Sequence, residues 1–249
     1  MINDQLSRYS RQILLPNFGI TGQERLQAAR VLIVGLGGLG SPVALYLAAA
    51  GVGRLLLADG DTVELSNLHR QIVHTTSRIG MLKAQSAQLA LAEQNPEVEL
   101  VTIEHRLTAD NLPPLLAEVD VVVDCCDNFA TRFALNAACV AARRPLVSGA
   151  VLRLEGQVTV FSGQPGDPCY RCLYPDSEDF NGDTCATNGI LAPIAGIIGS
   201  TQAAETLKIL TGIGTPLIGQ LLVLDGLTMR WRSLRLRADP ACPVCTQPR

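Results

Sequence analysis

A glycine-rich segment between a predicted strand and a predicted helix constrains the fold of this chain more than any other feature. The segment, GLGGLG at residues 35–40, follows the apolar run 31–34, which is typical of a buried strand. It precedes the Ala- and Leu-rich stretch 42–50, which predicts a helix. Glycines permit a tight turn and a close approach of the backbone to a ligand, and a helix start offers N–H groups to phosphate. We therefore expect a nucleotide site at this turn.

An acidic residue stands at the end of the next predicted strand. Asp59 follows the apolar run 55–58, and an acid at that position suits a ribose hydroxyl. Because a glycine-rich turn alone is a weak signal, two ligand classes fit at this point, a dinucleotide such as NAD and a mononucleotide such as ATP. A turn that serves packing alone is the less favoured interpretation.

Two basic residues follow where they can meet a phosphate. Arg70 lies in an irregular polar stretch after the second predicted strand, and Lys83 opens the predicted helix 83–94. In open α/β sheets, ligands bind beside the carboxyl ends of the strands. An Arg can fork onto phosphate oxygens and a Lys can act as a point charge. Each alone is more often a surface cation, but together with Asp59 they favour a phosphate site.

Asp127 follows another buried run, residues 121–123, and should face the same crevice. A carboxylate there can hold Mg²⁺ on the phosphates. The alternative is that Asp127 caps the next predicted helix, 130–142, since Asp and Asn are preferred caps. Asn128 can provide that cap instead, which would leave Asp127 for the ligand.

The pattern of predicted elements changes near residue 150. Helices alternate with strands before that point, whereas later runs of alternating residues predict antiparallel strands at 156–161, 219–224 and 229–236. We therefore expect one α/β domain over residues 1–249. Its Rossmann-like, doubly wound parallel part spans 1–150, and an antiparallel extension spans 151–249.

The amino-terminal segment is predicted to be helical. Residues 6–15 form one predicted helix with Arg8 and Arg11 on one face, a pattern that by spacing alone indicates a solvated basic face. A loop is expected at residues 16–22 and a second short helix at 23–29.

The composition excludes several classes of function. A net charge of −3 and a pI near 5.6 argue against a nucleic-acid binder. The apolar stretch 189–210 contains Gln202, Glu205 and Lys208, so it predicts a buried helix rather than a membrane span. Residues 1–10 are polar, so no signal peptide is expected, and we place the protein in the cytoplasm.

Two Cys-x-x-Cys pairs far apart in the sequence predict a zinc site. The two intervening residues let both sulfurs of a pair reach one tetrahedral ion, and four thiolates complete its shell, which indicates a structural metal. Redox dithiols or disulfides are the alternative. The predicted ligands are Cys169, Cys172, Cys242 and Cys245.

Cys185 lies in the polar, acidic stretch 174–188, which predicts a mobile loop. An exposed loop cysteine is a candidate nucleophile. The nearby Asp183 would not activate it, so a reactive role needs a cation from the fold or a partner. From chemistry alone, a reactive and an inert Cys185 are equally favoured.

Five sets of motifs extend over nearly the whole chain. They are RYSRQ at 8–12, GLGGLG at 35–40, SNLHRQ at 66–71, DCCDN at 124–128 and both Cys-x-x-Cys pairs. Together they resemble the motifs of the MoeB/ThiF group, bacterial relatives of the ubiquitin-activating enzymes. Family members usually have Gln where this chain has His69.

The resemblance implies an ATP-dependent adenylyltransferase. Its substrate would be the C-terminal glycine carboxylate of a small ubiquitin-like sulfur carrier ending in Gly-Gly, and pyrophosphate would be released. The carboxylate attacks the α-phosphate, so catalysis requires alignment and charge neutralisation rather than general-base chemistry. The resemblance also implies a homodimer in which Arg11 reaches the neighbouring subunit's site.

The same resemblance implies roles for individual residues. Gly38 would contact the nucleotide and Asp59 the ribose, while Asp127 would hold Mg²⁺. Arg11, Arg70, Lys83 and Asp127 would be the catalytic residues, with Cys185 as a possible nucleophile. The implied nucleotide-binding residues are Gly38, Asp59, Ser66, Asn67, Leu68, His69, Arg70, Gln71, Lys83, Asp127 and Asn128.

The resemblance allows more than one route of sulfur transfer and more than one biosynthetic pathway. Cys185 aligns with a cysteine that some relatives link covalently to the carrier, whereas others leave sulfur transfer to a cysteine desulfurase. The sequence has no appended rhodanese domain, so a persulfide is expected from a separate protein. Residues 148–161 resemble the molybdopterin branch, and residues 169–176 and 231–237 the thiamine branch. We lean slightly to molybdopterin.

Rival functions explain less of the sequence. An NAD-dependent oxidoreductase accounts for the glycine-rich turn and Asp59 but leaves Arg70, Lys83 and Asp127 without a role. A zinc-stapled scaffold that only binds a ubiquitin-like partner would not need these residues either. A tRNA-modifying relative is disfavoured by the acidic pI.

Overall fold

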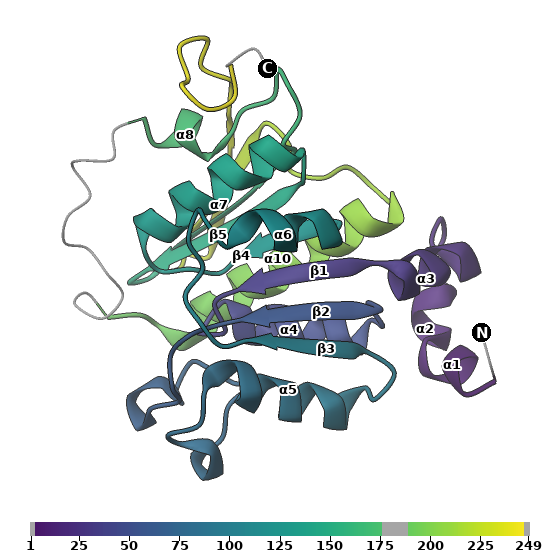
Figure 1. Cartoon of the computed structure of the whole chain (residues 1–249). Coiled ribbons are helices and arrows are strands. Elements are labelled where there is room, and N and C mark those ends of the chain that lie inside the picture. Colours follow the sequence, from purple (N-terminus) through teal and green to yellow (C-terminus); the bar gives the residue numbers. More distant parts are fainter. Residues whose placement is uncertain (1–2, 176–188, 247–249) are drawn as a thin grey trace.

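The chain folds around one mixed sheet of eight strands (Figure 1). The computed structural model describes residues 3–175 and 189–246. The strands lie in the order β3-β2-β1-β4-β5-β6-β7-β8. They are β1 (Arg30–Val34), β2 (Arg54–Ala58), β3 (Glu99–Ile103), β4 (Val121–Asp124), β5 (Leu146–Leu152), β6 (Glu155–Phe161), β7 (Gln220–Asp225) and β8 (Arg230–Arg235).

The first five strands run parallel, as the alternation of predicted strands and helices indicated. β1 is central and pairs with both β2 and β4, so Val31 stands between Leu55 and Val121. The strand order changes direction at β1, and ligands bind at such a switch point in doubly wound sheets.

Helices cover both faces of the sheet (Figure 1). Because side chains alternate along a strand, Val31 and Ile33 enter one core cluster and Leu32 and Val34 the other. The first cluster packs against α4 (Gly40–Ala49), α5 (Lys83–Gln94) and α10 (Ala192–Thr211), and the second against α6 (Leu112–Glu118) and α7 (Phe129–Ala142).

The antiparallel extension continues the same sheet. β5 and β6 form a hairpin, and β7 and β8 follow with antiparallel pairing, as predicted. The helix predicted within residues 189–210 is α10, which packs across β5 and β6. The close approach of α10 to β5 depends on Gly149, where a Cβ atom would lie 2.4 Å from the side chain of Gln202. Within the described parts of the chain, every helix is too short or too polar to cross a bilayer.

The prediction for the amino-terminal segment is wrong in detail. Instead of one helix over residues 6–15, the chain forms α1 (Asn3–Arg8) and α2 (Ser10–Ile13), and α3 (Gly19–Ala28) begins inside the predicted loop. The break comes at Tyr9, which is buried against Gly51 and whose hydroxyl accepts a hydrogen bond from Asn95. Burial of Tyr9 therefore overrides the local helical pattern.

Within residues 3–175 and 189–246, three further short helices connect the larger elements. They are the 3₁₀ helices η1 (Leu65–Asn67) and η2 (Thr76–Arg78) and the α-helical turn α8 (Tyr170–Leu173). The turn α8 follows directly after Cys169 and was not predicted from the sequence.

Candidate nucleotide pocket and cysteine cluster

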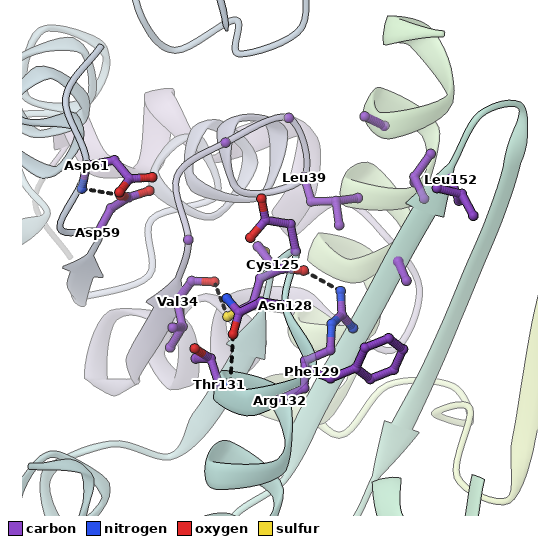
Figure 2. A pocket seen from close by; sticks show the side chains of 18 of the residues that line it. Val34, Leu39, Asp59, Asp61, Cys125, Asn128, Phe129, Thr131, Arg132 and Leu152 are labelled. Atoms are coloured by element: carbon purple, nitrogen blue, oxygen red, sulfur yellow. Dashed lines mark hydrogen bonds between the residues drawn. The ribbon is translucent and has the colours of Figure 1, made fainter. Parts of the chain in front are cut away.

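A pocket of about 630 Å³ opens where β1, β2 and β4 end (Figure 2). Val34 and Ala58 close two of these strands and line it, as do Cys125 and Cys126 after β4. Of the predicted nucleotide-binding residues, its walls include Gly38, Asp59, Arg70, Gln71, Lys83, Asp127 and Asn128. The topology thus brings together residues up to 90 positions apart in the sequence.

The glycines of the turn have different structural roles. Gly35 has a φ of +90°, and a Cβ atom there would lie 2.7 Å from the Cys125 carbonyl oxygen. A Cβ atom on Gly40 would overlap the Gly35 carbonyl. Gly38 lines the pocket, and its Cβ would lie 3.3 Å from the Cβ of Ala195. Gly35 and Gly40 are therefore required by the turn itself, whereas Gly38 leaves space at the pocket wall.

Asp59 fixes the backbone around the pocket. Its carboxylate accepts hydrogen bonds from the N–H groups of Leu36, at 2.8 Å, and Asp61, at 2.9 Å (Figure 2 shows the second). Burial raises the pKa of the Asp59 carboxyl above its ordinary value, against the opposing effects of the Lys83 cation and these two donors.

Two of the cations that line the pocket, Arg70 and Lys83, were predicted from the sequence. The Lys83 side chain is buried at the start of α5, and its Nζ lies 3.1 Å from Oδ2 of Asp61. The Arg70 Nη1 donates to the Ser66 carbonyl at 3.0 Å. The Oε1 of Gln71 is buried and has no hydrogen-bond partner among the described residues. A buried oxygen of this kind at a pocket wall is free to accept a hydrogen bond from a bound nucleotide.

Asn128, rather than Asp127, caps α7. The Asn128 Oδ1 accepts a hydrogen bond from the Thr131 N–H at 2.9 Å (Figure 2). This confirms the prediction that Asn128 can serve as the cap. The side chain of Asp127 is exposed at the pocket, where a hard cation that prefers oxygen ligands can reach it.

A buried ion pair that the sequence analysis missed supports this turn. Arg132 donates to Oδ2 of Asp124 at 3.1 Å, to the Gly149 carbonyl at 2.8 Å and to the Cys126 carbonyl. Ser148 also donates to Asp124, at 2.8 Å. The only available signal was a charged residue within an apolar helical stretch, eight residues after a strand-ending acid.

Other predicted residues lie outside the pocket. Ser66, Asn67, Leu68 and His69 lead up to Arg70 but are not among the described residues that line the walls. Cys185 lies outside the described residues, as do positions 176–188 of the predicted loop.

Arg11 belongs to α2, which lies toward the amino ends of the parallel strands, opposite the end where the pocket opens (Figure 1). Its neighbour Gln12 donates to the Ala50 carbonyl at 3.1 Å, at the C-terminal end of α4. The pocket surrounds the N-terminal end of the same helix, whose ten residues span about 15 Å. Arg11 therefore lies at a different end of the subunit from the subunit's own pocket.

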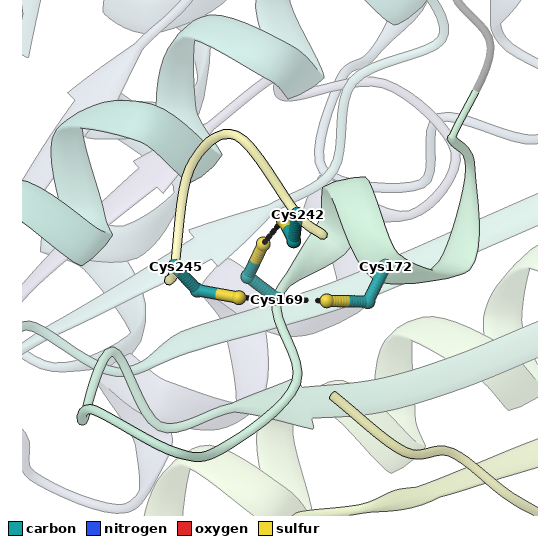
Figure 3. A group of neighbouring side chains, drawn as sticks. All are labelled: Cys169, Cys172, Cys242 and Cys245. Atoms are coloured by element: carbon teal, nitrogen blue, oxygen red, sulfur yellow. Dashed lines mark hydrogen bonds between the residues drawn. The ribbon is translucent and has the colours of Figure 1, made fainter. Parts of the chain in front are cut away.

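The four cysteines of the two Cys-x-x-Cys pairs converge (Figure 3). Their Sγ atoms all lie within 4.8 Å of one another, with Cys169–Cys242 at 3.6 Å and Cys172–Cys245 at 3.5 Å. Zinc–sulfur bonds of about 2.3 Å in a tetrahedron place sulfurs about 3.8 Å apart. The cluster therefore fits a zinc site, with Asn136 donating to the Cys169 sulfur from outside.

Curated relatives resemble the chain along its length. The molybdopterin-synthase adenylyltransferase of Escherichia coli (strain K12) is 49% identical, covering 98% of each chain. The sulfur carrier protein ThiS adenylyltransferase of the same organism is 48% identical, covering 98% of this chain and 97% of the relative. A Drosophila willistoni protein, adenylyltransferase and sulfurtransferase MOCS3, is 48% identical over 99% of this chain and 54% of its own length. This chain thus spans about half the length of relatives of the MOCS3 kind.

Solved structures share the fold at lower identity. A crystal structure of E. coli MccB with MccA-N7isoASN superposes with a TM-score of 0.84 at 23% identity, over 98% of this chain and 76% of that chain. Selenomethionine-labelled PaaA gives a TM-score of 0.82 at 24% identity, over 96% and 76%. The ThiF family model matches residues 9–244, nearly the whole chain, so the protein belongs to the ThiF family.

Proposed function

We propose that this protein is an adenylyltransferase that uses ATP to activate the C-terminal carboxylate of a ubiquitin-like sulfur carrier. The observation that carries the proposal is the gathering of a glycine-rich turn, two cations and an exposed carboxylate around one pocket at a topological switch point. The names of the E. coli relatives support the reaction and its carrier substrate.

The pocket residues suit a displacement at the α-phosphate. The carrier carboxylate forms a bond to the α-phosphorus as the bond to pyrophosphate breaks, so negative charge must be aligned and neutralised. Arg70 and Lys83 line the pocket as cations, and Asp59, which lines it too, would bind a ribose hydroxyl. Asp127 would hold Mg²⁺, which supplies further neutralisation of the phosphates.

The carrier and its pathway are narrower proposals. Identities of 49% and 48% to the two E. coli relatives do not separate a molybdopterin from a thiamine pathway, and we retain a slight preference for molybdopterin. Sulfur would come from a cysteine desulfurase or another donor. Cys185 remains a possible nucleophile for a covalent link to the carrier. Thiols used in this way suit the reducing cytoplasm, where we place the protein.

We further propose a homodimer in which Arg11 completes the partner's pocket. The position of α2 at the end of the sheet opposite the subunit's own pocket supports a role in trans. Zinc would be structural, because four thiolates leave no coordination site for substrate. It would join the C-terminal tail that carries Cys242 to the body that carries Cys169.

The reaction is tested by the exchange of labelled pyrophosphate into ATP in the presence of carrier. Asp127→Ala should lower exchange by at least about 100-fold, because Mg²⁺ would lose its protein ligand. Asp110→Ala, which removes an exposed aspartate elsewhere, is the matched control and should retain exchange. Normal turnover by a folded Asp127→Ala protein would refute the metal role. Protection against heating by NAD⁺ but not by Mg-ATP would instead favour an oxidoreductase.

The role of Arg11 in trans is tested by mixing two inactive variants. Arg11→Ala and Arg70→Ala subunits should regain part of their activity as heterodimers, because one of the two pockets then contains both arginines. Heterodimers that form but stay inactive would contradict the proposal.

A further inference from the structure

We propose that His74 is a positioning residue of the ATP site, which fixes the Leu36 carbonyl of the glycine-rich turn relative to helix α5 and Lys83. The inference rests on the proposed function, since it names a further residue of the same site. His74 lies outside the set of pocket-lining residues and was not singled out from the sequence.

The two ring nitrogens of His74 have different partners. Nε2 lies 3.0 Å from the Leu36 carbonyl oxygen and Nδ1 lies 2.9 Å from Oγ of Ser86. A carbonyl can only accept, so Nε2 carries the proton and donates it, and Nδ1 accepts from the Ser86 hydroxyl. The contacts therefore select one neutral tautomer of a ring that is 5% exposed.

These bonds close a ring of interactions around the pocket. The Leu36 N–H donates to Asp59 at 2.8 Å, and Asp59 also accepts from the Asp61 N–H at 2.9 Å. Asp61 accepts from Lys83 Nζ at 3.1 Å. Ser86 lies three residues after Lys83 on α5, so both side chains share one helical face. His74 joins Ser86 back to Leu36.

The closed ring distinguishes His74 from a histidine that merely fills the core. The backbone of Leu36 is held on both sides, by Asp59 at its N–H and by His74 at its carbonyl. Leu36 immediately precedes Gly37 and Gly38, which line the pocket. Without the bond from His74, the turn could rotate away from the orientation in which its N–H groups face a phosphate.

The surroundings keep His74 uncharged. Burial, followed by the nearby cations Lys83 and Arg78, lowers the pKa of His74 to about 4, against the effect of the Leu36 carbonyl. Arg78 also donates to the Ser86 carbonyl at 2.9 Å. The bond from Ser86 to the unprotonated Nδ1 is therefore maintained at neutral pH.

The test separates nucleotide positioning from loss of stability. His74→Phe keeps a ring but removes both hydrogen bonds, and should raise KM for ATP in pyrophosphate exchange by about five- to tenfold, the effect of one lost hydrogen bond. KM for the carrier should stay within about twofold, well below the effect of one lost hydrogen bond. His74→Gln, which can still donate to Leu36, should recover part of the affinity for ATP.

Leu91→Ala is the matched control, because it removes a fully buried side chain from the same helix but leaves both hydrogen bonds of His74 in place. It should lower stability yet leave KM for ATP unchanged. An unchanged KM in His74→Phe, or an equal rise in Leu91→Ala, would overturn the proposal. If His74→Phe does not fold, KM for ATP in Ser86→Ala and in His74→Gln is compared with that in Leu91→Ala. A rise in neither variant would then overturn the proposal.

Direct binding of Mg-ATP separates the two proposals. If the wild-type protein binds Mg-ATP but exchanges no pyrophosphate with any carrier, the proposed reaction fails, and the dissociation constant for Mg-ATP still tests His74. Weaker Mg-ATP binding by His74→Phe than by Leu91→Ala supports positioning, and equal binding by the two variants refutes it.

Discussion

Replacing Arg132 by methionine should cost about 3–5 kcal/mol of unfolding free energy, the usual effect of removing one partner from a buried ion pair. The Arg132 side chain is 6% exposed and that of Asp124 is 0% exposed, so water cannot solvate the carboxylate that remains. Asp124 keeps its hydrogen bonds from Ser148 and the Cys126 N–H, which limits the loss. The Gly149 carbonyl loses its donor from Arg132, which adds to the cost.

A double-mutant cycle isolates the charge effect. Asp124→Asn removes the charge while keeping a side chain of similar shape, so the double variant no longer buries an unpaired ion. We expect a coupling energy of at least about 2 kcal/mol between the two sites. Arg54→Met is the matched control, because Glu99 and Glu118, the partners of Arg54, are largely exposed. This substitution should lower the unfolding free energy by less than about 1 kcal/mol.

Urea unfolding followed by circular dichroism measures these differences, with zinc-saturated protein at one fixed concentration. A loss below about 1 kcal/mol for Arg132→Met, or strictly additive effects in the cycle, would show that the pair is not structurally required. The same variants should also lower pyrophosphate exchange, since Arg132 holds the turn that carries Asp127.

Two further predictions concern metal removal and pH. Removing zinc with a chelator should lower Tm by at least about 10 °C, because structural zinc binding contributes on the order of 10 kcal/mol to folding. Loss of activity with an unchanged Tm would contradict a structural role. His74 should make the protein acid-sensitive: its pKa of about 4 is below the ordinary value of 6.5, so the unfolded chain binds the proton first as pH falls. The contribution of neutral His74 to the unfolding free energy is complete above pH 6.5 and is lost as the pH falls toward 4. At pH 5 the loss should be about 2 kcal/mol. His74→Gln should lack this component, and identical pH profiles of the two proteins would refute it.

Much of the pocket could be predicted from local patterns combined with one rule of topology. Apolar runs located β1, β2 and β4, and parallel strands have their carboxyl ends at one edge of the sheet. That rule predicts that Asp59 and Asp127 face one crevice, and both line the pocket. The two Cys-x-x-Cys pairs were predictable for a similar reason, because their spacing encodes the geometry of one ion.

The missing features depend on contacts between distant segments. Nothing local to Tyr9 indicates that it packs beside Gly51 and interrupts a helix. His74 likewise acquires its role only because Leu36 and Ser86 meet it in the folded chain. Arg132 appears in the sequence as one charge in an apolar helix, and only the fold shows that it neutralises Asp124.

The most direct test of the central claim is pyrophosphate exchange into ATP with each candidate Gly-Gly-ended carrier in turn, using zinc-loaded protein. We expect exchange that depends on one carrier and that disappears with Asp127→Ala but not with Asp110→Ala. Exchange with a single carrier would also identify the pathway. Absence of exchange with every carrier, from folded protein that binds Mg-ATP, would contradict adenylation of a ubiquitin-like carrier.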